Sequence, residues 1–275
     1  AERRYREALQ INPSLANALE GLGRLLSRQG RLEDAIEPLT LAARSPDIAD
    51  DRAADDAASA ARALIELDRT EEAETVLQRA LVRAPESQRA LLELARLYER
   101  LDRKPDEAIV LERLAELSLS SMLRAEVGYR QAMLLAKQFR VDPMSEAGEK
   151  ARALLLEAVG ADAMHAQARQ ALLELAGARS EWSIVAHMHF LAIRELPPGP
   201  RRALTHLDLA ETYLDRLADA QSSIRNLAAG VQLAPLDVVV LQRANSLAHR
   251  LPDLGEAAER LEHFARAAAR PELGE

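Results

Sequence analysis

Four arginines recur along the chain at nearly constant intervals. Arg24, Arg62, Arg96 and Arg130 are separated by 38, 34 and 34 residues. A guanidinium group can bind a carboxylate through two parallel hydrogen bonds, and it stays charged at physiological pH. If the four arginines occupy one position of a repeated unit, they form a ladder that could bind acidic side chains of a partner. Packed helices lie about 8–10 Å apart, so an extended peptide would meet a rung at about every third residue.

The same arginines have acidic neighbours about one helical turn away. These neighbours are Glu20, Glu66, Glu93, Glu99 and Glu126. Pairs at this spacing are common on solvated helix surfaces and stabilise a helix by about 0.2–0.5 kcal/mol. Two interpretations therefore stay open, a partner-binding ladder and a surface that neutralises itself. The binding ladder predicts that charge reversal at Arg62 and Arg96 weakens binding and leaves the melting temperature unchanged.

Apolar residues take the place of these charges in the second half of the chain. When the repeat is continued into this half, the helix face that carries the arginines in the first half is expected to carry Leu173, Leu204, Leu207 and Val239. We call this face the inner face. Such a strip could seat an amphipathic helix or another hydrophobic segment of a partner. Because helices in stacked repeats bury two faces, these side chains could instead belong to the core.

No group of residues predicts catalysis, a cofactor or a metal site. His187 and His189 are two residues apart, so on a helix they point about 200° apart and cannot share a metal ion. The Gly-Leu-Gly at 21–23 lies in a helical pattern rather than after a strand, which argues against a phosphate-binding loop. The chain has no cysteine, which excludes disulfides and thiolate metal ligands. We therefore expect a protein that is not an enzyme.

The elements that position these residues repeat along the chain. Ala1, Tyr5, Ala8 and Pro13 stand at spacings of four, three and five residues. The same spacing returns at 73–85 and 186–198, and with small substitutions at 223–235. A second apolar stripe precedes these segments, as in 19–26, where leucines stand three and four residues apart. Each stripe covers one face of a helix, so the sequence predicts successive pairs of amphipathic helices.

This pattern resembles that of the tetratricopeptide repeat (TPR) family, whose unit is a helix–turn–helix of 34 residues. The resemblance covers essentially the whole chain. It implies an all-α fold, an α-solenoid of stacked antiparallel helix pairs that form a right-handed superhelix. The first helix of each pair, which we call the inner helix, is expected to line the concave face. One domain is expected over residues 1–275, with 1–15 as the second helix of a truncated repeat and 271–275 as a tail. The complete repeats are expected at about 16–49, 50–87, 88–121, 122–164, 165–200, 201–237 and 238–270. The longer turn at 141–149 is the candidate hinge.

Composition limits the classes of partner. The net charge of −8 argues against a nucleic-acid partner, because phosphate backbones require a basic face. No apolar run approaches the roughly 18 residues of a membrane span, so none is expected. Arginine in place of lysine, next to abundant alanine, is typical of a GC-rich bacterial genome. The compartment stays open, and we favour the cytoplasm over the periplasm.

The resemblance implies a function as well as a fold. We expect a non-catalytic scaffold or adaptor that binds another protein or peptide in the concave groove. The alternative is the recognition or regulatory arm of a larger enzyme or assembly complex, whose catalytic part lies outside this sequence. Self-association is a third hypothesis, because the end of a cut solenoid exposes apolar helix faces.

Overall fold

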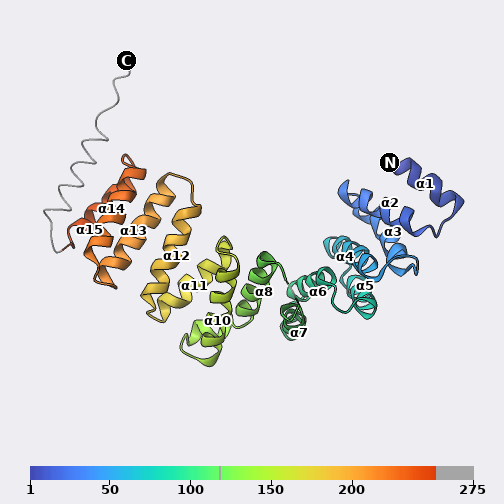
Figure 1. Cartoon of the computed structure of the whole chain (residues 1–275), viewed down its shortest axis with the longest axis horizontal. Coiled ribbons are helices and arrows are strands. Elements are labelled where there is room, and N and C mark those ends of the chain that lie inside the picture. Colours follow the sequence, from blue (N-terminus) through green and yellow to red (C-terminus); the bar gives the residue numbers. More distant parts are fainter. Residues whose placement is uncertain (118, 252–275) are drawn as a thin grey trace, which may run out of the picture. The chain divides into compact units, whose positions relative to one another are not determined.

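The chain is helical throughout the part that the computed structural model describes, residues 1–117 and 119–251 (Figure 1). Fifteen helices and no strand occur in these residues, which confirms the prediction of an all-α fold. In the first 120 residues the helices are α1 (Glu2–Ile11), α2 (Ala16–Arg28), α3 (Leu32–Arg44), α4 (Asp50–Glu66), α5 (Thr70–Arg83), α6 (Gln88–Arg100) and α7 (Lys104–Ala115). From residue 121 onward they are α8 (Ser121–Leu134), α9 (Ala136–Val141), α10 (Glu146–Ala161), α11 (Ala166–Ala178), α12 (Trp182–Glu195), α13 (Pro200–Asp215), α14 (Ala220–Leu233) and α15 (Val238–Ala248).

The helices group into two compact units, residues 1–120 and residues from 121 onward. In the first unit α2 packs against α3, α4 against α5 and α6 against α7. In the second unit the packed pairs are α8 with α10, α11 with α12 and α13 with α14. Helix α15 packs against α13 and α14. It is the first helix of the repeat predicted at 238–270, and residues 252–270 of that repeat and the tail 271–275 lie outside the described residues.

Small residues let the helices of a pair approach closely. Leu22 and Leu26 of α2 bury themselves against Ala35 and Leu39 of α3. A Cβ atom added at Gly23 would lie 2.5 Å from the Leu39 Cγ atom, too close for any carbon–carbon contact. The glycine in the apolar stripe of α2 therefore sets the distance between α2 and α3.

The turn between paired helices repeatedly uses one residue with a left-handed backbone. The φ angle is 75° at Gly30, 63° at Asp68, 53° at Asp102, 58° at Ser180 and 52° at Ala218. Only glycine adopts this conformation without a steric penalty, because any other residue brings its Cβ atom close to the backbone. The turn is thus a feature of the fold rather than of one residue type.

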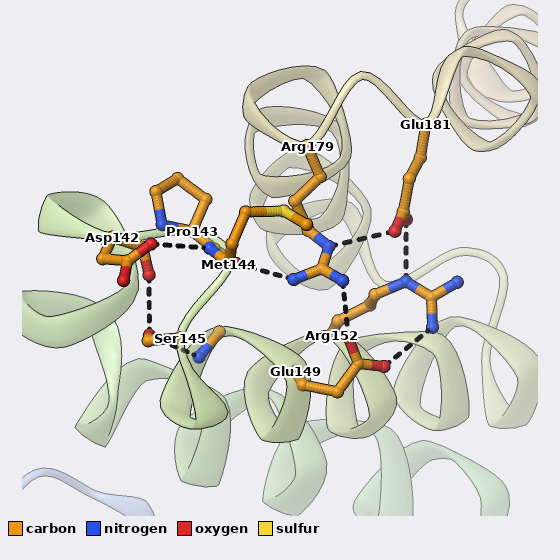
Figure 2. Close-up of polar contacts among 9 residues, drawn as sticks. Asp142, Pro143, Met144, Ser145, Glu149, Arg152, Arg179 and Glu181 are labelled. Atoms are coloured by element: carbon orange, nitrogen blue, oxygen red, sulfur yellow. Dashed lines mark hydrogen bonds and ion pairs between the residues drawn. The ribbon is translucent and has the colours of Figure 1, made fainter.

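The predicted hinge at 141–149 is fastened by polar contacts. Arg179, at the end of α11, donates a hydrogen bond from Nη1 to the carbonyl oxygen of Pro143 at 2.6 Å (Figure 2). The same guanidinium pairs with Glu149 at 2.5 Å and with Glu181 at 2.9 Å. Its side chain is almost fully buried, whereas that of Glu149 is 57% exposed, so the contact with Glu149 lies at the edge of the solvent. The stretch is therefore a turn with polar contacts to Arg179, and the hinge stays a prediction.

The extra residues of this turn also have their own local structure. The short helix α9 leads into the turn, and its Phe139 is buried against α10. Ser145 caps α10 by accepting a hydrogen bond from the Gly148 backbone nitrogen at 3.2 Å. A Cβ atom at Gly148 would collide with the carbonyl oxygen of Pro143, so the tight path of this turn depends on glycine.

Candidate partner-binding surfaces

Arg24 of α2 is held by carboxylates from two neighbouring inner helices. Its Nη2 atom lies 2.8 Å from Glu20 Oε1, one turn earlier on the same helix. The Nε atom donates to Asp56 Oδ1 of α4 at 3.0 Å, and Nη2 lies 2.9 Å from the same oxygen. Arg52 of α4 pairs in return with Glu20. Helices α2 and α4 are therefore joined by two arginine–carboxylate contacts that run in opposite directions.

The next arginine repeats this arrangement one repeat further along. Arg62 of α4 donates from Nε to Glu93 Oε1 of α6 at 3.0 Å. Arg96 reaches the same oxygen of Glu93 from within α6, also at 3.0 Å. The hydrogen bond with Glu93 is the main reason that the pKa of Arg62 is raised above its ordinary value. One carboxylate thus positions two guanidinium groups.

The arginines and their carboxylates differ sharply in exposure. The side chains of Arg24, Arg62 and Arg96 are 41–48% exposed, whereas those of Asp56 and Glu93 are 0% and 2% exposed. The carboxylates therefore lie beneath, and the guanidinium groups lie at the surface. We call Arg24, Arg62 and Arg96 the arginine layer. Each of these cations is held in position by an ion pair with a buried carboxylate.

The sequence indicated only some of these pairs. The contact of Arg24 with Glu20 and that of Arg96 with Glu93 have the predicted spacing. The pairs that join different helices link residues 31 or 32 positions apart. A helical wheel compares residues within one helix, so it does not predict these pairs. Their signal is the repeat length itself, because an acid one repeat after an arginine lies on the adjacent inner helix.

Asp56 is the least solvated acid of this surface. It is fully buried, and its Oδ2 atom has no hydrogen-bond partner among the described residues. Burial raises the pKa of Asp56 to about 6, against the opposing pull of Arg24. The acid is held in its ionised form by Arg24 alone at hydrogen-bonding distance, and it can take up a proton slightly below neutral pH.

Arg130 does not present the exposed rung that the spacing predicted. It lies on α8, in the second unit, and only 6% of its surface is exposed. The acidic neighbour Glu126 lies 3.0 Å from the Nε2 atom of His165. His165 also caps α11, because its Nδ1 atom accepts a hydrogen bond from the Ala168 nitrogen. The spacing of 34 residues is kept at Arg130, but the side chain is buried, so it offers no exposed guanidinium group there.

The second unit contains an open pocket of about 550 Å³ between α11, α12 and α13. Leu173 of α11 and Leu204 of α13, two residues of the predicted apolar strip, line it together with Met188 of α12. Its polar wall contains Arg169, which pairs with Glu195. The pocket therefore offers apolar surface beside a fixed ion pair, a combination typical of ligand sites.

The other two residues of the predicted strip lie elsewhere. Leu207 is fully buried in the core, on a stripe with Ala203 and Ala210 that faces α14. The Cβ position of Gly230 on α14 lies 3.1 Å from a Leu207 methyl carbon. Val239 is 59% exposed on α15 and is outside the pocket. Of the two interpretations that the sequence left open for Leu207, the structure agrees with the core, because α13 buries its i, i+4, i+7 stripe against α14; Leu207 is not available to a partner.

The described residues contain no group of three histidine, aspartate or glutamate side chains that could hold a metal ion. His189 lines the pocket of the second unit, and burial lowers its pKa. His187 stacks on Phe190 with ring centroids 6.5 Å apart. Over residues 1–117 and 119–251, no helix has both the length and the apolar character required to cross a membrane.

The chain is similar to known repeat proteins in sequence and in structure. Residues 1–58 and 58–118 each match the tetratricopeptide repeat family. The fold resembles that of PilF from Pseudomonas aeruginosa, with a TM-score of 0.55 and 16% identity over 84% of this chain and 96% of the other. It also resembles a tetratricopeptide repeat protein from Parabacteroides merdae, with a TM-score of 0.53 and 14% identity over 93% and 99% of the two chains. No curated protein matches the chain significantly.

Proposed function

We propose a function from one premise: residues 1–118 belong to the tetratricopeptide repeat family, and the other described helices have the fold of that family. On this basis the protein is a non-catalytic scaffold or adaptor that binds another protein or peptide. The arginine layer of the first unit is its main recognition surface, and its ligand is an extended segment with regularly spaced acidic side chains.

One observation carries this proposal, the inequality of exposure between each arginine and its carboxylate. An exposed ion pair neutralises itself and offers a partner little. In the arginine layer the acids are buried and the guanidinium groups are half-exposed. A guanidinium has five N–H donors, and the contacts of Arg24 and Arg62 with their carboxylates use Nε and Nη2, which leaves the Nη1 hydrogens to face a ligand. Because the groups are already fixed, a ligand binds them with a smaller loss of side-chain entropy.

The two interpretations of the arginines are therefore compatible. The buried acids make the net charge of this surface small, so long-range attraction of an acidic partner is weak. Short-range recognition remains strong, since bidentate contact depends on the position of the donors. The pocket with Leu173 and Leu204 would act independently, as a site in the second unit for an apolar side chain.

A peptide pair tests the arginine layer. The first peptide has about ten residues with glutamate at every third position, and the second carries glutamine at those positions. At low ionic strength we expect the glutamate peptide to bind about tenfold tighter in fluorescence anisotropy, with the difference shrinking in salt. Equal affinity of the two peptides would overturn the proposal.

Two matched variants locate the binding. Arg62→Gln/Glu93→Gln removes the pair of the arginine layer without changing the net charge, and it should abolish the preference for glutamate. Arg3→Gln/Glu7→Gln removes an exposed pair of α1 and also keeps the net charge. This second variant should bind like the unaltered protein, and a loss of preference in both would also contradict the proposal.

A further inference from the structure

We infer that the first unit has a second binding site, for a compact apolar group that carries a carboxylate. The site is a pocket of about 220 Å³ between α3, α4 and α5, which we call the α3–α5 pocket. Ala57 of α4 lies in its wall and stands five residues before Arg62, so the two point about 140° apart around the helix. The inference is independent of the arginine layer and of the function proposed for it.

The pocket exists because α4 departs from the repeat pattern. At the position of Leu19 in α2 and Leu91 in α6, α4 has Ala57. The floor of the pocket is completed by further alanines, among them Ala54 and Ala80. An alanine fills less space than the leucine of the neighbouring repeats, and the difference is left as a hollow between the helices.

The hollow has the size of one small organic group. An apolar cavity of about 150 Å³ in another protein accommodates benzene, so 220 Å³ has room for an aromatic ring or a branched aliphatic group. Val76 adds an apolar wall beside the alanines. The transfer of such a group from water to this surface supplies the driving force for binding.

Polar groups at the same pocket select the charge of the ligand. Arg44 and Arg79 line it, and within the described residues neither forms an ion pair. Arg83, by contrast, is committed to Asp50 and to backbone carbonyl oxygens. Two cations without a partner beside an apolar hollow complement a ligand that is apolar at one end and anionic at the other.

Thr40 provides a further, independent observation. Its hydroxyl oxygen is buried at the pocket, and it has no hydrogen-bond partner among the described residues. A buried hydroxyl without a partner loses the hydrogen bonds that it would make in water. A ligand that displaces the side chains covering this oxygen would accept a hydrogen bond from the Thr40 hydroxyl through its carboxylate.

Benzoate is the probe for this site, with benzyl alcohol as its uncharged counterpart. We expect benzoate to shift the backbone amide NMR signals of α3, α4 and α5 selectively and to bind at least fivefold tighter than benzyl alcohol. A short peptide ending in leucine with a free carboxyl group, compared with its amide, tests whether a chain terminus is the source of the same chemistry. If neither benzoate nor the peptide with the free carboxyl group shifts these signals at about 10 mM, the inference is overturned.

Variants distinguish the pocket from general surface binding. Ala57→Leu restores the leucine of the neighbouring repeats, so it should fill the hollow and weaken benzoate binding at least tenfold while the protein stays folded. Arg44→Gln/Arg79→Gln should weaken benzoate at least fivefold and leave benzyl alcohol unchanged. If Ala57→Leu impairs folding, Thr40→Val replaces it, with an expected loss of at least threefold. Unchanged benzoate binding in the arginine variant would contradict the site.

Discussion

The Nε atom of Arg62 lies 3.0 Å from Glu93 Oε1, and the two side chains it joins are 48% and 2% exposed. The contact links α4 to α6, two inner helices of successive repeats. Arg62 lies at the surface and Glu93 is buried, so the two residues have different roles in the protein. The arginine offers donors to the solvent, and the buried glutamate has Arg62 and Arg96 as its hydrogen-bond partners.

Charge reversal at Arg62 is therefore expected to destabilise the protein as well as to affect binding. Arg62→Glu would leave the buried Glu93 with Arg96 and add a second negative charge beside it. We expect a loss of about 1–3 kcal/mol in the free energy of unfolding, measured by urea denaturation with circular dichroism. This differs from the unchanged melting that the sequence pattern predicted, because the pattern placed the acidic partner on the exposed surface.

The matched comparison is Arg3→Glu on α1. Arg3 pairs with Glu7 at 2.8 Å, and both side chains are more than half exposed. Its reversal should cost less than about 1 kcal/mol, since an exposed pair contributes little. Equal losses at the two sites would show that burial of Glu93 has no influence on the role of Arg62.

The second prediction concerns Asp56 and pH. Its pKa is about 6 in the folded protein and 3.8 as its ordinary value, so between these pH values the folded state binds more protons. The contribution of Asp56 to stability is therefore fully present below about pH 3.8 and is lost as the pH rises through 6. Asp56→Asn, which stays neutral, should gain stability relative to the unaltered protein by on the order of 2–3 kcal/mol between pH 3.5 and pH 8.

Urea denaturation of both proteins at several pH values measures this difference. The other titrating groups are the same in the two proteins, so they largely cancel when the two free energies are subtracted. A difference that does not change with pH would mean that Asp56 has an ordinary pKa. A difference that falls as the pH rises would mean that Arg24 stabilises the charged form more than burial disfavours it.

The helix pairs could be predicted because their determinants are local. Leu22, Gly23 and Leu26 form a stripe within one helix, and the stripe must be buried wherever the helix packs. The close contact between Gly23 and Leu39 follows from the same pattern. Whether Leu207 lies on the inner face or in the core was harder to predict. Helix α13 has two apolar faces, and the sequence pattern does not indicate which neighbouring helix each face contacts.

The cross-helix contacts of the arginines could be anticipated only in part. Whether Arg24 meets Asp56 depends on how α2 and α4 are offset along their axes, and the repeat spacing gives that offset to within about a turn. The α3–α5 pocket was missed for another reason. Ala57 fits the alanine-rich composition of α4, and only alignment with Leu19 and Leu91 shows that a large side chain is lacking.

The third prediction concerns Arg179 and the fastened turn. Arg179→Ala would remove the donor to the Pro143 carbonyl oxygen and the partner of Glu149 and Glu181 (Figure 2). We expect a loss of about 1–2 kcal/mol, because Arg179 loses its hydrogen bonds while the exposed Glu149 returns to solvent and Glu181 keeps Arg152 as a partner. Hydrogen exchange of the amides at 142–148 should accelerate more than that of α14, since α14 makes no contact with this network.

A milder substitution separates the two roles of Arg179. Arg179→Lys keeps the positive charge and loses the forked geometry that reaches three acceptors at once. Its stability should lie between those of the unaltered protein and Arg179→Ala. If all three proteins exchange the amides at 142–148 at the same rate, the turn is held by the Ser145 cap and the backbone rather than by Arg179.

The last prediction uses the left-handed residues of the turns as a matched pair. Ala218 has a φ angle of 52° and Gly30 one of 75°, and both occupy the turn between two packed helices. A left-handed alanine costs about 1–2 kcal/mol, whereas glycine loses about 0.5–1 kcal/mol of chain entropy on folding. Ala218→Gly should therefore stabilise the protein by about 0.5–1 kcal/mol, and Gly30→Ala should destabilise it by a similar amount.

A Cβ atom built at Gly30 has no heavy atom within 4 Å apart from its chain neighbours, so the destabilisation by Gly30→Ala would come from the backbone and not from a clash. Thermal denaturation of the two variants measures both, and a shift of the same sign in the two would rule out backbone conformation as the cause.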